Sequence, residues 1–412
     1  MSDSDSPDQP GNNPLFDLSR LFAGAGDPWA SAEQLAAAVA SEGGSEPNVD
    51  PIIRLQFEEL ARVAELQVSA APGVSLPPAT TVVPVTRSLW TTRSFDTYRP
   101  FFERFGEAVS AATDPSAFGP GADAGAADPF GAMFGQLFGA LGPMLVSASA
   151  GSMLGHLGQR ALGQYDLPVP RTNDEVLVVP SNIDAAATEW GVDRDGLRLW
   201  IMIHEFAAHA VLRVPHVQKR MESLLIDFAA AFTLNPDALG EQFSSLGNIT
   251  DLSQIQELSE QLNDPELLLT MLRSPAHDLL VPQFDAMVAS VIGFVGHTVD
   301  RIASGLIADH AEIRQQFRQR WIDVAPADRF MERLLGLEIT AATFERGDAF
   351  VNGIDERAGA EGLERLWADE LDLPTAAEVD APGLWLARIG FDTEPGQVST
   401  EVPDDLSGLD DL

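Results

Sequence analysis

The feature that most constrains the fold of this chain is a helical spacing of apolar residues, which recurs from residue 50 to about residue 370. Two of the clearest helical patterns are PIIRLQFEELARVAELQVS at residues 51–69 and FMERLLGLEITAATFERGDAFVNGI at residues 330–354. Runs typical of strands are short, namely TTVVPV at residues 80–85 and EVLVVP at residues 175–180. We therefore predict an α+β protein that is predominantly helical and has a few short strands.

The polar ends of the chain suggest one large domain between two flexible segments. We predict a flexible acidic segment with short helices over residues 1–47, a domain over residues 48–390, and an acidic disordered tail over residues 391–412. Residues 129–159 carry no charge, and this run is long enough to raise the question of a membrane span. Its seven glycines favour closely packed core helices instead, so we expect no membrane insertion.

Charge and composition exclude several classes of function. The chain has 62 acidic and 25 basic residues, a formal net charge of -37, which disfavours binding to nucleic acids and to anionic membranes. It has no cysteine, so disulfides, thiolate catalysis and cysteine-type zinc sites are impossible. The first residues, MSDSDSPDQPGNN, do not form a signal peptide, and we expect the protein to be cytoplasmic.

One pair of residues suggests chemistry, His204-Glu205 in the middle of the helical pattern LRLWIMIHEFAAHAVL. Zinc peptidases of the H-E-x-x-H type place two histidines four residues apart on a helix, about 40° apart around its axis, with the glutamate as general base. Here the second histidine is His209, five residues on and therefore about 140° away. Ala208 stands at the position of the second ligand. His204 and His209 would bind one zinc ion only across a π-bulge.

The order and spacing of several sequence blocks resemble the zincin-like metallopeptidase family, a former domain of unknown function with some members associated with deazaflavin-cofactor biosynthesis. The resemblance covers residues 48–390 and implies a zincin-like fold with an active-site-type helix. It is carried by the blocks GQYDLPVP, VLVVPSNI, WGVDRDGLRLWIMIHEFAAHAVLRVPHV, GFVGHTVD, GLEITAATFERGDAFV, LPT and PGLWLARIG.

The resemblance also implies where zinc ligands would stand. His204 matches the first zinc histidine of the family and Glu205 its catalytic glutamate, whereas Ala208 replaces the second histidine. The family draws a third ligand from a Glu-Gly-aromatic-Val-acid stretch on a later helix. In the matching stretch of this chain, Ile292 stands at the ligand position and Gly296 at the position of an outer acid.

Two readings of the function follow. A zinc ion that activates water needs three protein ligands, so the losses predict a catalytically impaired or non-catalytic member of the family, a pseudoenzyme with no zinc or weakly bound zinc. Such a protein would bind an unknown protein or peptide partner. The alternative is an active zinc-dependent metallopeptidase or hydrolase that uses His204, Glu205 and the shifted His209. His297, on the helix of Ile292, is a further candidate ligand.

Overall fold

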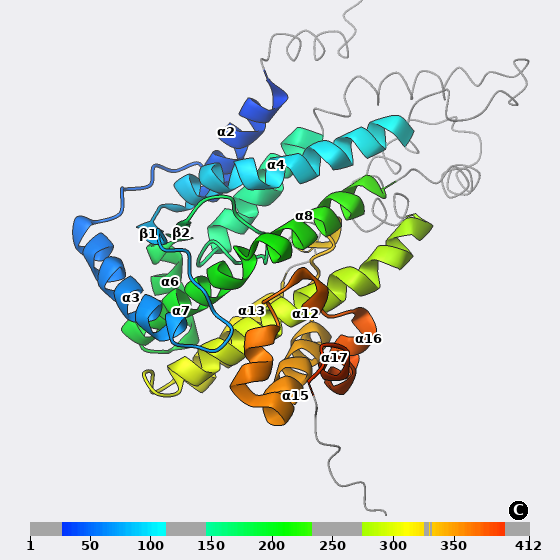
Figure 1. Ribbon diagram of the computed structural model, residues 1–412. Coiled ribbons are helices and arrows are strands. Elements are labelled where there is room, and N and C mark those ends of the chain that lie inside the picture. Colours follow the sequence, from blue (N-terminus) through cyan, green and yellow to red (C-terminus); the bar gives the residue numbers. More distant parts are fainter. Residues whose placement is uncertain (1–26, 113–145, 233–273, 325–328, 330–331, 392–412) are drawn as a thin grey trace, which may run out of the picture. The chain divides into compact units, whose positions relative to one another are not determined.

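The computed structural model describes residues 27–112, 146–232, 274–324, 329 and 332–391. These residues form a predominantly helical protein with two short parallel strands, which confirms the predicted fold class (Figure 1). Most of the predicted N-terminal segment and nearly all of the predicted tail lie outside the described residues, so these boundaries stay predictions. The chain divides into two compact units, and each is described by itself.

The first unit consists of residues 1–48, 85–161 and 229–274. Its described helices are α2 (Pro28–Ala40), α4 (Arg87–Ala112) and a helical segment at residues 146–160. Glycines bring this segment close to α2, because a Cβ atom on Gly151 would lie 2.4 Å from the carbonyl oxygen of Ala32. The described part of the charge-free run thus packs against another helix, whereas residues 129–145 lie outside the described residues.

The second unit consists of residues 49–84, 162–228 and 275–412, and it carries both strands. The strands are parallel, with Thr81 opposite Glu175 and Pro84 opposite Val178. Its elements are α3 (Pro51–Ser69), β1 (Thr81–Pro84), β2 (Glu175–Val178), α6 (Pro180–Trp190), α7 (Arg194–Leu212), α8 (Pro215–Ala230), α12 (Pro275–Ala303), α13 (His310–Ile322), α15 (Ala341–Arg365), η2 (Glu370–Asp372), α16 (Ala376–Asp380) and α17 (Pro382–Arg388).

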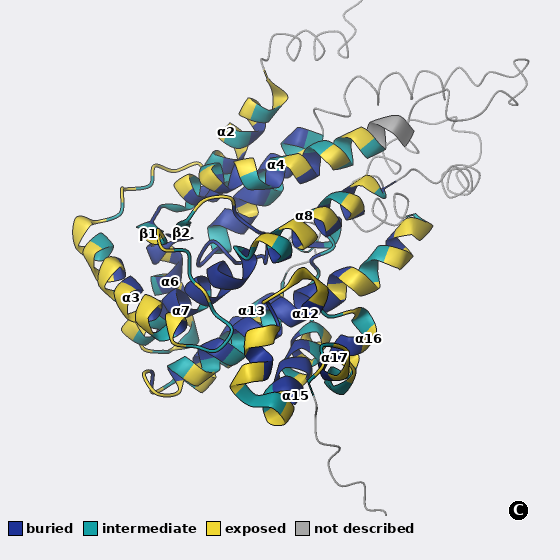
Figure 2. Ribbon diagram, viewed as in Figure 1, coloured by how far each residue is buried: buried dark blue, intermediate teal, exposed yellow. Residues whose placement is uncertain are grey.

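Helix α7 is the core helix of the second unit. Its N-cap is Asp193, whose side chain accepts a hydrogen bond of 2.7 Å from the backbone nitrogen of Gly196. The helix packs against α3, α6 and α12, and Figure 2 shows that it is buried along most of its length. A helix that is apolar on nearly all sides is stable only inside a core, and this explains its central place.

Two glycines fix the crossing of α12 and α15. A Cβ atom on Gly293 would lie 2.3 Å from the carbonyl oxygen of Gly347, and one on Gly347 would lie 2.3 Å from that of Ala289. The two backbones are therefore in direct contact, an approach that only glycine permits. Because Ile292 precedes Gly293, the crossing also fixes the direction in which Ile292 faces.

We expect Gly293→Ala to lower the free energy of unfolding by about 1–3 kcal/mol, because the new methyl group overpacks this crossing. The matched control is Gly383→Ala, since a Cβ atom at Gly383 meets nothing within 4 Å. Denaturant unfolding of both variants measures the difference. An unchanged unfolding midpoint for Gly293→Ala would show that the two helices can separate without cost.

The predicted continuous helix over residues 330–354 is wrong, because the chain turns between its two halves. Gly336 has a φ of +71°, a left-handed conformation that ends a helix. A Cβ atom there would lie 2.6 Å from the ring of Phe284. The chain then runs without helix until Thr340, the N-cap of α15. Residues 325–328 and 330–331 lie outside the described residues.

Within the described part of the chain, α12 is the one helix long and apolar enough to cross a membrane. Its most apolar window is 56% buried inside the protein. A core helix of a globular protein passes the same test of length and composition, so this finding is weak evidence for a membrane span.

Candidate functional site

A cavity of about 50 Å³, which we call the α7 cavity, lies beside α7 in the second unit. Helix α7 lines it with four residues at a spacing of four, Trp200, His204, Ala208 and Leu212. Residues at this spacing lie about 40° apart around the helix axis and so form one stripe. A volume of this size holds a few water molecules.

The three predicted zinc-ligand positions meet in this cavity. His204 and Ala208 line it from α7, and Ile292 lines it from α12. The ring of His204 stacks on that of Trp200, with centroids 5.6 Å apart and planes 12° apart. Where a zincin would surround its metal with three donor atoms, this protein has one imidazole, one methyl group and one branched hydrocarbon.

His209 lies away from the α7 cavity and is not among its lining residues. It is fully buried, and its Nδ1 shares a hydrogen bond of 2.7 Å with the Tyr165 hydroxyl. Its Nε2 has no hydrogen-bond partner among the described residues. Burial, together with repulsion from Arg213, lowers the pKa of His209 to about 4, so the ring is neutral at pH 7. Burial raises the pKa of Tyr165 above its ordinary value.

The pairing of His204 with His209 would require a bulge in α7. The helix is α-helical without interruption from Arg194 to Leu212, and the two rings take different environments. The structure therefore places His204 at the cavity and His209 in the core beside Tyr165. It does not bring the two predicted metal ligands together.

Glu205 is buried and held by the chain segment that precedes β2. The backbone N–H of Tyr165 donates to Oε2 of Glu205 at 2.9 Å, and Nδ1 of His204 lies 3.3 Å from Oε1. A Cβ atom on Gly163 would lie only 2.3 Å from Cδ of Glu205. Glu205 is not among the residues that line the cavity. A general base must reach the water it activates, whereas this carboxylate anchors residues 163–165 and contacts His204.

An ionic network borders the same cavity. Arg314 lies 2.6 Å from Asp300 and 3.2 Å from Asp348, and Arg318 binds Asp348 through two contacts of 2.7 and 2.8 Å. Burial raises the pKa of Asp300 above its ordinary value, although Arg314 and Arg318 oppose this shift. Gly296 lies next to this network, since a Cβ atom there would make ordinary contact with the guanidinium of Arg318, at 3.5 Å. The predicted position of an outer acid thus faces an arginine.

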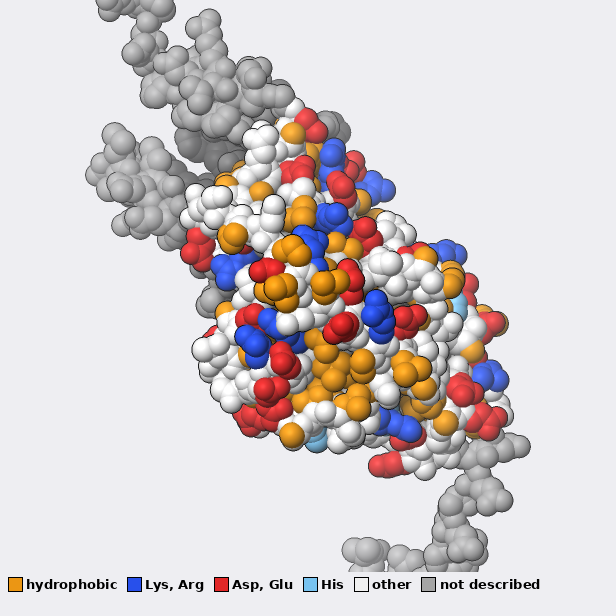
Figure 3. Space-filling model, turned by 90° about the vertical axis from the view of Figure 1, so that its left-hand side faces the viewer, with side chains coloured by type: hydrophobic (Ala, Val, Ile, Leu, Met, Phe, Trp, Pro, Cys, Tyr) orange, Lys and Arg blue, Asp and Glu red, His pale blue; other side chains and the backbone are white. Residues whose placement is uncertain are grey.

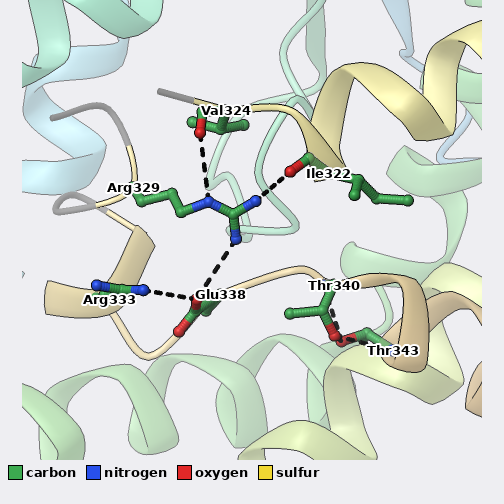
Figure 4. Close-up of polar contacts among 7 residues, drawn as sticks. All are labelled: Ile322, Val324, Arg329, Arg333, Glu338, Thr340 and Thr343. Atoms are coloured by element: carbon green, nitrogen blue, oxygen red, sulfur yellow. Dashed lines mark hydrogen bonds and ion pairs between the residues drawn. The ribbon is translucent and has the colours of Figure 1, made fainter. Parts of the chain in front are cut away.

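A second set of polar contacts holds the segment that joins α13 to α15 (Figure 4). Arg329 donates to the carbonyl oxygens of Ile322 and Val324, which lie at and just beyond the end of α13. Glu338 then accepts from Arg329 at 3.4 Å and from Arg333 at 3.2 Å. These contacts connect the end of α13 to Glu338, which directly precedes Ile339, a residue that lines the α7 cavity.

The start of α15 follows this segment and also contributes to the lining of the α7 cavity. Thr340 and Thr343 form a reciprocal capping box, in which each backbone N–H donates to the other's hydroxyl, at 3.3 and 3.2 Å. Ile339 and Phe344, on either side of this box, line the α7 cavity. The cap therefore fixes two apolar residues of the site.

The residues present do not fit a catalytic zinc ion. In the part of the chain that the structure describes, no group of three histidine, aspartate or glutamate side chains is placed to hold a metal. His297 contacts Asn352 at 3.2 Å and Asp355 at 3.6 Å, and it lines a different cavity. Of the histidines among the described residues, His204 alone lines the α7 cavity, and the carboxylates that line it, Asp166 and Asp300, are each paired with an arginine.

Sequence reasoning found the positions on α7 and α12 but missed the ionic network. Asp300 comes from α12, Arg314 and Arg318 come from α13, and Asp348 comes from α15, so no local pattern predicts that they meet. The one usable signal was the spacing of the two arginines, four residues apart on one helical face.

Comparisons with known proteins found a family model and a solved structure that match the chain. The zincin-like metallopeptidase family matches residues 28–386 of the chain. A crystal structure from Chloroflexus aurantiacus, described as "a putative hydrolase with a novel fold", has 20% sequence identity and a TM-score of 0.59, over 88% of this chain and 98% of that one. This likeness concerns the fold alone. No curated protein matches the chain.

Proposed function

Because the chain belongs to the zincin-like metallopeptidase family, we propose that it is a catalytically impaired or non-catalytic member whose cavity binds a protein or peptide segment. One observation carries this proposal: His204, Ala208 and Ile292, at the three zinc-ligand positions, line one cavity but offer a single donor side chain. One imidazole cannot hold zinc in the three-ligand arrangement that activates water.

The lining of the α7 cavity supports a binding role for an apolar group. Most of the surrounding side chains are hydrocarbon or aromatic, with few polar groups at the border, as in ligand sites generally. Burial of one apolar side chain in such a place contributes about 1.5–3 kcal/mol. The apolar lining consists of Pro168, Trp200, Ala208, Leu212, Val291, Ile292, Val295, Phe317, Trp321, Ile339 and Phe344.

The second candidate is an active zinc-dependent metallopeptidase or hydrolase that uses His204, Glu205 and His209. It is favoured by the retained contact of 3.3 Å between His204 Nδ1 and Glu205 Oε1, which leaves Nε2 of His204 as the donor for a metal. This function requires α7 to bulge and His209 to give up its bond to Tyr165. Both changes cost free energy, since they would leave buried polar groups without partners.

Metal binding separates the two candidates. We expect the full chain, purified without a metal-binding tag and dialysed against zinc, to retain far less than one zinc ion per chain. His209→Ala should not change this content. We also expect hydrolysis of a mixed peptide substrate in the presence of zinc to be no faster than for Glu205→Gln. One tightly bound zinc ion that His209→Ala removes, with peptidase activity that Glu205→Gln abolishes, would establish the active enzyme instead.

A further inference from the structure

Helix α3 has two apolar faces on opposite sides. Phe57, Ala61, Ala64 and Val68 are buried and lie within an arc of about 60°, at the regular helical angle per residue. The opposite face, within an arc of about 80°, carries four large apolar side chains that are exposed to solvent. We call this face the α3 stripe; it consists of Ile52, Leu55, Val63 and Leu66, which are 65%, 59%, 41% and 69% exposed.

Figures 2 and 3 show the part of the second unit in which α3 lies. In Figure 2 the outer residues of α3 are exposed while its inner residues are buried. Figure 3 looks onto the side of Figure 1 where α3 lies, and hydrophobic side chains gather on that face. Single exposed apolar residues are normal, but a row of four on one helix face indicates a surface that binds another protein.

Two charged residues give the α3 stripe a preferred partner. Glu59 lies within the stripe and Arg62 at its edge, and both are exposed. The described structure gives neither of them an ion pair or a side-chain hydrogen bond. When such a face packs antiparallel against the same face of a second copy, the acidic residue of each helix can lie opposite the basic residue of the other.

We propose that the α3 stripe docks on the α3 stripe of a second copy of this chain, as an antiparallel helix pair. In such a pair, a step of four residues forward on one helix is a step of four residues back on the other. The register that sets Leu55 opposite Leu66 therefore also sets Glu59 opposite Arg62. Two-fold symmetry repeats each pair, so the interface has two leucine pairs and two ion pairs.

A second cavity lies beside Ser69, the residue that this register sets opposite Ile52 of the second copy. It has a volume of about 300 Å³ and lies at the C-terminal end of α3, lined by Gln67, Ala70, Ala71, Pro72, His297, Thr298, Arg301, Ile302, Gly305, Leu306 and Leu363. The same register sets Ile52 of the second copy opposite Ser69, beside this cavity. Ile52 of the second copy would thus lie against apolar side chains at the rim of this cavity, including Leu306, which is 46% exposed.

The net charge of the chain opposes self-association, so the interface must be nearly neutral. The two Glu59–Arg62 pairs set the register without adding net charge. At about 0.15 M salt the screening length is about 8 Å, and repulsion between the remaining acidic surfaces is then mostly screened. For this reason, dimer formation should be measured at about 0.15 M salt.

Sedimentation equilibrium of the full chain over a wide concentration range tests the proposal. We expect a monomer–dimer equilibrium that Leu55→Glu or Leu66→Glu weakens by about tenfold or more, because each places a carboxylate in the apolar stripe. The control is Leu371→Glu, a change at a leucine that is 80% exposed and lies outside the stripe, which should have no effect. Far-UV circular dichroism confirms that the variants are folded.

Charge reversal tests the register. Glu59→Arg and Arg62→Glu should each weaken the dimer, and the double variant should restore it, because the two ion pairs are then formed with the charges exchanged. A protein that is monomeric at every concentration overturns the proposal, as does a dimer that Leu55→Glu leaves unchanged. A double variant no stronger than the single variants overturns the antiparallel register.

Discussion

Lowering the pH from 6.5 to 4 should cost this protein about 3 kcal/mol of stability through one buried side chain, His209. Burial, with repulsion from Arg213, lowers the pKa of His209 from 6.5 to about 4 in the folded state, although Asp174 opposes this shift. The unfolded chain therefore binds the proton more readily. The stabilisation is fully present above pH 6.5 and is lost progressively as the pH falls toward 4.

Denaturant unfolding between pH 4 and pH 8, in the presence of a chelator, measures this effect. His209→Asn removes the titrating ring and keeps a polar atom near the Tyr165 hydroxyl, so its stability should fall less steeply below pH 6.5. The control is His156→Asn, a change at an exposed histidine that should keep the steep slope of the parent. Equal slopes for the parent and His209→Asn would show that His209 is not the source of the pH dependence.

The fold class was predictable because the helical spacing of apolar residues is strong in the long helices. Helix α13 nevertheless has a weak sequence signal, for a physical reason. Its buried residues are Ile313, Phe317 and Trp321, a single row at a spacing of four, and nearly all the others are polar. So narrow a stripe carries little amphipathic signal, and the helix is stabilised by packing of this row in the core rather than by its own sequence.

The site was predictable only where one helix or one family motif defines it. The resemblance places Ile292 at the third-ligand position, which stays a prediction, and the contact of Gly293 with Gly347 fixes the direction in which Ile292 faces. The bond between Tyr165 and His209 joins residues 44 positions apart. Such long-range pairs have no local pattern, so a single sequence does not reveal them.

Zinc binding should be recoverable in this protein by two substitutions, Ala208→His and Ile292→Glu. The first places a second imidazole four residues after His204 on the stripe that lines the α7 cavity, a spacing of about 40° that suits one ion. The second adds a carboxylate from α12, which lines the same cavity. Each substitution alone should change zinc affinity little, because two donors hold the ion weakly.

The double variant should bind zinc at least about 100-fold more tightly than either single variant, because each ligand orders the ion for the others. Competition with a chromophoric chelator measures the affinity. Without zinc the double variant should be less stable than the parent, since it buries new polar groups, and zinc should raise its melting temperature.

Two further substitutions in the double variant identify the ligands. His204→Ala should abolish the gained zinc affinity, whereas His209→Asn should leave it unchanged, because His209 lies outside the α7 cavity. If the double variant binds no better than the single variants, Ile292 does not face the ion and the assignment of the third position is wrong. If the parent already binds zinc tightly and His209→Asn removes that binding, α7 bulges to form a working site and the degenerate-site interpretation fails.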